Sequence, residues 1–351
     1  MIARRRLANQ HLIGAPLASP EAVVRRLAAV QAQDYPGAKW AIGQRLRGGA
    51  QAVVDEALDA GRILRTHVLR PTWHIVLPED ARWMLRLTGP KVSERMAPYN
   101  RQLQLDAALL ARSNDAMARA LEGGKHLTRK ELGDALEAAG LPARGQRLAH
   151  MTAQAELDQV VVSGAQRGKQ QTYALFDERV PPAPARSRDE MLADLAARYF
   201  AAHGPALVHD FAWWSWLAVG EAKRAIEMAG LTRATLDGKT YWHAPPGRAS
   251  RLRSPTVHLL PNYDEYFIAY KERDLAPVKL EARQLLASHF VVLDGRMIGG
   301  WRRVPAKRGV VVDARLFRRL DAAARRALER EADRFGRFLG LPVELRVSLA
   351  R

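Results

Sequence analysis

The chain has 351 residues, 48% hydrophobic and 26% charged, which is the profile of a globular protein long enough for two to four compact units. It contains no cysteine, which excludes disulfides, thiol nucleophiles and cysteine-ligated zinc or iron–sulfur centres. Its formal net charge of +18 favours a polyanionic partner, and nucleic acid is the partner we expect. No apolar run is long enough to span a membrane and no signal peptide is recognisable, so we expect a cytoplasmic, nucleoid-associated protein.

The N-terminal third, residues 1–110, begins with a clear helix start. Ser19-Pro20-Glu21 supplies an N-cap, a first-turn proline and an acid, and apolar residues follow at helical spacing. We expect this helix to end before Pro36. A second helix is expected over 50–60, followed by short strands at 65–68 and 72–76. Helices followed by a pair of strands are the outline of a winged helix.

Residues 111–180 repeat this outline. Ser113 and Asn114 are candidate caps of one helix, and Thr128-Arg129-Lys130-Glu131 is a capping-box pattern that opens the next. A third helix, expected over 145–158, resembles a recognition helix. Its DNA-contacting face would carry three polar residues at spacings of three and four: Arg147, His150 and Gln154.

A basic hairpin is expected directly after this helix. Strands at 160–162 and 172–175 flank a glycine-containing tip that includes Arg167 and Lys169. Such a wing is suited to phosphate contacts.

A proline-rich linker at 181–184 separates a third unit, residues 187–247. Helices are expected at 188–202, 207–217 and 220–229, followed by a hairpin around Asp237-Gly238. The second of these helices carries three tryptophans, which we expect to lie mostly in the core: Trp213, Trp214 and Trp216.

The last segment, residues 248–351, has a different pattern. We expect a strand at 256–260, a hairpin at 290–301 turned by Asp294-Gly295, a long helix over 313–338 and a final strand at 343–348. The whole chain is therefore predicted to be α+β, with three tandem winged-helix modules and a C-terminal α+β region. The acidic run Tyr263-Asp264-Glu265-Tyr266 lacks a spaced histidine cluster, so we expect a carboxylate here to pair with an arginine rather than to bind a metal.

Four segments together resemble the AlkZ/AlkX family of winged-helix DNA glycosylases, over nearly the whole chain and in the expected order. They are Ala29–Tyr35, Arg70–His74, Leu259–Tyr266 and Asp294–Arg302. The resemblance implies three winged helices around a concave, positively charged channel for double-stranded DNA. It also implies excision of N7-alkylated guanine, including the unhooking of interstrand crosslinks, by a monofunctional enzyme. Gln31-Ala32-Gln33 matches the family's Gln-x-Gln motif, so Gln31 and Gln33 are the candidate catalytic residues.

The chemistry of such a substrate suits two glutamines. An N7-alkylated guanine already carries a positive charge, so its departure needs no protonation, and the protein need only aim a water and stabilise charge on the sugar. Two amides can hold that water by accepting and donating hydrogen bonds. They share a face only in extended backbone, so the helix must end near Gln31. The alternative is that both glutamines cap the helix end.

Three neighbouring residues are further candidates for catalysis or DNA contact. Asp34 could activate water or offset cationic charge, or be a solvated turn residue. Thr72 and His74 share one face of a predicted strand and could contact a phosphate or flipped nucleotide, although a buried, hydrogen-bonded His74 is equally compatible with the pattern. Trp73, on the other face, is expected to pack in the core.

Three C-terminal arginines, Arg296, Arg302 and Arg303, are additional candidates for DNA contact. We expect neither metal nor cofactor, no membrane association and a monomer. The competing function is a winged-helix transcriptional regulator without catalytic activity. A nuclease or ligase is disfavoured because the chain lacks a P-loop, an HExxH and a DxD array.

Overall fold

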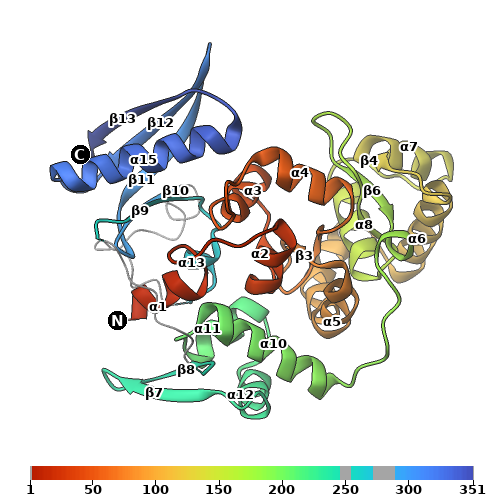
Figure 1. Ribbon diagram of the computed structural model, residues 1–351. Helices are drawn as coiled ribbons and strands as arrows, with labels where there is room; N and C mark the ends of the chain where they lie inside the picture. The colour runs from red at the N-terminus through yellow and green to blue at the C-terminus, as the bar shows by residue number, and fades with distance from the viewer. Residues whose placement is uncertain (1, 246–253, 272–288, 351) are drawn as a thin grey trace.

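Four small β-sheets are distributed among helices in the computed structural model, which describes residues 2–245, 254–271 and 289–350 (Figure 1). The prediction of a mixed α+β fold is confirmed. The expected boundary at residues 247 and 248 lies outside the described residues.

The N-terminal part contains a three-stranded sheet of order β1-β3-β2, with helices before and between its strands. Its elements are α1 (Ile2–Asn9), α2 (Pro20–Leu27), β1 (Val30–Gln31), α3 (Tyr35–Gly43), α4 (Gln51–Asp59), β2 (Leu64–His67) and β3 (Trp73–Val76). Both predicted strands are present, and so is the cap, because the Ser19 hydroxyl accepts a hydrogen bond from the Ala22 N–H.

The predicted end of the first helix is wrong in detail. Helix α2 already ends at Leu27, because Ala28 adopts a positive φ of 66° that a helix cannot continue. Pro36 does not end a helix but lies in the first turn of α3, where its missing N–H costs nothing. The chain between Leu27 and Tyr35 is therefore free to contribute the short strand β1.

A long helix, α5 (Pro78–Gln102), connects this part to the second unit. That unit contains α6 (Ala107–Leu121), β4 (Leu127–Thr128), α7 (Arg129–Ala138), α8 (Gly145–Leu157), β5 (Val161–Ser163), β6 (Thr172–Leu175) and α9 (Phe176–Arg179), with sheet order β4-β6-β5. The capping box of Thr128 and Glu131 is confirmed. The predicted caps Ser113 and Asn114 are wrong, because α6 begins earlier in the chain, where the Asp106 carboxylate caps it, and Ser113 is buried within the helix.

The third unit matches its prediction closely. It contains α10 (Arg188–His203), α11 (Val208–Ser215), α12 (Val219–Met228), β7 (Thr232–Leu236) and β8 (Lys239–His243). The turn residues Asp237 and Gly238 have the positive φ values, 49° and 73°, that a two-residue hairpin requires.

The C-terminal part is a five-stranded sheet of order β13-β12-β11-β10-β9, against which helix α15 lies (Figure 1). Its elements are β9 (Val257–Leu260), α13 (Glu265–Ile268), β10 (His289–Leu293), β11 (Arg296–Ala306), β12 (Gly309–Leu316), α15 (Ala322–Leu339) and β13 (Val343–Leu349). The Asp294-Gly295 turn is confirmed. A helix beginning at Asp313 is wrong, because β-branched Val310, Val311 and Val312 form a buried central strand and Asp321 caps α15 instead.

The hydrophobic cores cross the borders of the expected units. One cluster joins α5 to α10, α11 and α12, and another joins α2, α3 and α4 to the C-terminal sheet and α15. Ala29 belongs to the first cluster, and Val30 and Ala32 belong to the second. The Gln31 segment therefore lies at the junction of the two largest cores, which hold its backbone from both sides.

Candidate functional site

Gln31 lies on extended backbone that the sheet fixes. Gln31 is paired with His74 across the antiparallel β1–β3 ladder, and the Ala32 N–H donates to the Trp73 carbonyl at 2.7 Å. Strand β1 ends at Gln31, so Gln31 itself has extended backbone, whereas Gln33 lies in the bend that leads into α3. The alternative that these residues cap a helix end is wrong for α2, which stops four residues before Gln31.

The side chain of Gln31 is held by an arginine. Gln31 is only 4% exposed, and its Oε1 accepts a hydrogen bond of 2.6 Å from Arg70. Because a guanidinium can only donate, this contact fixes which end of the amide is oxygen and leaves the NH₂ group directed elsewhere. Arg70 itself is buried, and it also donates to the Ile268 carbonyl at 3.4 Å.

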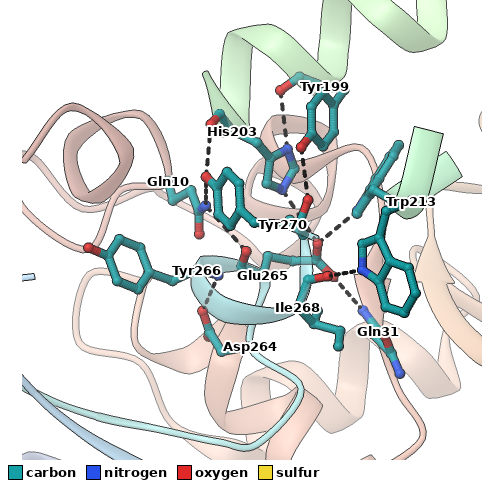
Figure 2. Close-up of polar contacts among 12 residues, drawn as sticks. Gln10, Gln31, Tyr199, His203, Trp213, Asp264, Glu265, Tyr266, Ile268 and Tyr270 are labelled. Atoms are coloured by element: carbon teal, nitrogen blue, oxygen red, sulfur yellow. Dashed lines mark hydrogen bonds and ion pairs between the residues drawn. The ribbon is translucent and has the colours of Figure 1, made fainter. Parts of the chain in front are cut away.

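A fully buried carboxylate supports the backbone of Gln31. Glu265 Oε1 accepts from the Gln31 N–H at 2.9 Å (Figure 2). Its Oε2 accepts from the Trp214 indole N–H at 2.9 Å. The Nε2 atom of His203 lies 3.4 Å from the same Oε2. Glu265 therefore ties β1 to α10 and α11, which come from the third unit.

The neighbouring acid has an architectural role. Both carboxylate oxygens of Asp264 pair with the Arg45 guanidinium, at 2.8 and 2.9 Å, and both side chains are fully buried. The prediction that a carboxylate of this acidic run pairs with an arginine is confirmed.

Gln33 and Asp34 lie nearer the surface. Gln33 is exposed, whereas Asp34 is partly buried and caps helix α3 by accepting the Gly37 N–H at 3.2 Å. Asp34 also borders a cleft between α3 and the C-terminal part, lined in addition by His289, Trp301 and Arg303. The structure thus gives Asp34 a helix-capping role.

Thr72 and His74 differ in their access to solvent. Thr72 is partly exposed, but His74 is fully buried and its Nδ1 lies 3.0 Å from the Thr72 carbonyl. Burial first, and then the charge of Arg70, hold the pKa of His74 well below its usual 6.5, so the ring is neutral. Of the two alternatives stated for His74, the buried, hydrogen-bonded histidine is the one that fits its full burial.

The polar face of α8, for which DNA contact is predicted, is partly covered by other parts of the protein, and Arg147 and His150 remain partly exposed. Helix α5, which the sequence did not reveal, packs against this face. Arg147 donates to the carbonyls of Leu103, Gln104 and Pro142, and the His150 ring lies 2.7 Å from the Asn100 amide oxygen. Gln154, 9% exposed, bonds Ser93 and Asp158.

The basic residues predicted on the hairpins are all exposed: Arg167, Lys169, Arg296, Arg302 and Arg303. Arg167 pairs with Glu131 at 2.7 Å and Arg302 with Asp313 at 2.8 Å, which leaves both cations at the surface.

Three residues around Gln31 were missed as site residues by sequence reasoning: Arg70, Trp213 and Glu265. Arg70 and Glu265 belong to the motifs that carry the family resemblance, but their contacts with Gln31 come only from the tertiary fold. A separate cleft of about 290 Å³ is lined by Leu69, Thr88 and the α11–α12 connection. Among the described residues no group of three or more His, Asp or Glu could hold a metal, and no helix is long and apolar enough to cross a membrane.

Two comparisons with known proteins bear on the family and the fold of this chain. The family model "DNA glycosylase AlkZ-like" matches residues 24–338, and the chain therefore belongs to the AlkZ-like family of DNA glycosylases. Among solved structures it is similar to the Streptomyces sahachiroi DNA glycosylase AlkZ, with a TM-score of 0.79 and 22% sequence identity. That match covers 99% of this chain and 98% of the other. No curated protein matches.

Proposed function

We propose that the protein hydrolyses the N-glycosidic bond of N7-alkylated purines in double-stranded DNA, acting as a monofunctional glycosylase with Gln31 and Gln33 positioning the water. The observation that carries this proposal is a buried, oriented Gln31 amide at the end of strand β1, followed two residues later by the exposed Gln33. Membership of the AlkZ-like family supports it.

The contacts of Gln31 define what it can do. Its Oε1 has two lone pairs, and one of them accepts the hydrogen bond from Arg70. The second lone pair can accept a hydrogen bond from a water, and the NH₂ group can donate one. Because a neutral amide is a weak base, its contribution is orientation, which is sufficient for a leaving group that already bears a positive charge. We place the water between the buried amide of Gln31 and the exposed amide of Gln33.

The scaffold proposed for this chemistry is modular. We infer that the units 1–110, 111–180 and 187–247 act as tandem winged helices around a concave basic channel, with the 248–351 region closing it. The net charge of +18 and the exposed arginines of the hairpins supply the phosphate contacts. The protein would act as a monomer and need no cofactor, and purines within interstrand crosslinks are substrates of the same chemistry.

The test is excision from duplex DNA that contains N7-methylguanine, with protein in excess and release of the free base followed by chromatography. Gln31→Ala and Gln33→Ala should each lower the release rate by about 100-fold, the size of effect expected when positioning is lost, while leaving duplex affinity nearly unchanged. Sequence-selective binding of undamaged DNA with no base release would instead favour a transcriptional regulator.

A further inference from the structure

Trp213 projects to the surface directly beside the candidate catalytic glutamine. It is 40% exposed, whereas the next residue on α11, Trp214, is fully buried and donates a hydrogen bond to Glu265. An exposed aromatic side chain alone says little, because single exposed apolar residues are common. Here the contacts of the ring provide the second observation.

Trp213 is connected to Gln31 through Arg70, because Trp213 and Arg70 both donate to the Ile268 carbonyl. Its Nε1 donates to the Ile268 carbonyl at 3.0 Å, and Arg70 donates to that same oxygen and, at 2.6 Å, to Gln31 Oε1. The Arg70 guanidinium also lies 5.9 Å from the centre of the indole ring. Trp213, Arg70 and Gln31 thus form one connected unit, although α11 comes from the third unit of the chain and Gln31 from the first.

This arrangement offers a preorganised aromatic surface. The hydrogen bond to Ile268 fixes how the indole is turned, so little side-chain freedom is lost when a flat ligand stacks on it. The substrate of the proposed function is a flat aromatic base, and enzymes that act on bases extrude the nucleotide and replace its lost stacking with protein side chains.

We propose that Trp213 is the stacking surface for the alkylated purine when that nucleotide enters the Gln31 site. This inference rests on the proposed glycosylase function and deepens it. A purine stacks on an indole face, and the positive charge of an N7-alkylated base adds electrostatic attraction to the ring. Trp213 would therefore favour the charged lesion over an unmodified purine.

The test compares two variants. Trp213→Phe keeps an aromatic ring, whereas Trp213→Leu keeps an apolar side chain but has no ring. Phe317→Leu is the matched control, because Phe317 is also an exposed aromatic, 36% accessible, at the end of β12. Under single-turnover conditions, Trp213→Leu should release N7-methylguanine at least about tenfold more slowly than wild type, whereas Trp213→Phe should retain most of the rate. All three variants should bind undamaged duplex as wild type does, since phosphate contacts dominate that affinity.

Two outcomes overturn the proposal while leaving the glycosylase function intact. One is an excision rate for Trp213→Leu equal to that of wild type. The other is an equal loss in Trp213→Phe and Trp213→Leu, which would assign the effect to the indole N–H bond with Ile268 rather than to stacking. Absence of release by wild type would instead refute the proposed function itself.

A readout independent of catalysis completes the test. In a Gln31→Ala/Gln33→Ala background, duplex containing the lesion should quench tryptophan fluorescence more than undamaged duplex does. Adding Trp213→Phe should abolish that difference, and a difference that persists would contradict the stacking role.

Discussion

Replacing Asp264 by asparagine should destabilise the protein strongly, because it leaves a buried guanidinium without its counter-ion. Arg45 makes five hydrogen bonds, one for each of its N–H groups, and two of them go to Asp264. The amide that replaces the carboxylate would turn its NH₂ group toward one of these donors. Removing one partner from a buried ion pair costs about 3–5 kcal/mol, and we expect a loss in this range.

The assay is denaturant unfolding, monitored by tryptophan fluorescence and circular dichroism together. Asp134→Asn, which removes an exposed ion pair with Lys130, is the control and should leave the unfolding midpoint unchanged. The double variant Arg45→Met/Asp264→Leu should lose less stability than the sum of its single variants, because no charge stays buried alone. A cost below about 1 kcal/mol for Asp264→Asn would show that the buried pair stabilises the protein no more than an exposed ion pair does.

Three other predictions concern local features. Burial raises the pKa of Glu331 to about 7. The folded protein therefore binds this proton more tightly than the unfolded chain, and stability should fall as the pH rises from about 4.5 to 7. Glu331→Gln should raise stability at pH 8, by on the order of 3 kcal/mol, and hardly at all below pH 4.5, as thermal unfolding at both pH values would reveal. Thr128→Ala should cost about 1 kcal/mol through loss of the α7 capping box, whereas Thr128→Ser should retain it in the same unfolding assay. The logarithm of DNA affinity should fall linearly with the logarithm of salt concentration. The double variant Arg167→Gln/Lys169→Gln should make that slope shallower by about two, because we propose that each of these two wing residues contacts a phosphate. An unchanged slope would show that the wing does not contact DNA.

Local signals identified much of the fold from the sequence. The capping box at Thr128, the Asp-Gly turns and the helices of the third unit depend on residues within a few positions of one another, and their elements formed as predicted. Helix α5 was missed because Pro90 and Pro98 interrupt its pattern. The strand β12 was mistaken for the start of a helix, since the choice there depends on pairing with β11 and β13 rather than on the local sequence.

The candidate site was only partly predictable for a related reason. The Gln31-Ala32-Gln33 segment is contiguous, so its motif could be recognised. The partners that orient it are distant in sequence: Arg70 is 39 residues away and Glu265 is 234 residues away. The contacts of α5 with His150 and Gln154 on α8 could not be predicted, because α5 itself was not predicted.

The release of free N7-methylguanine from duplex DNA, compared between wild type and the Gln31→Ala/Gln33→Ala variant, tests the central claim most directly. Wild type should release the base well above the spontaneous rate, and a variant that is folded and still binds the duplex should release it at or near the spontaneous rate. Equal release by both proteins, or no release by either, would contradict it.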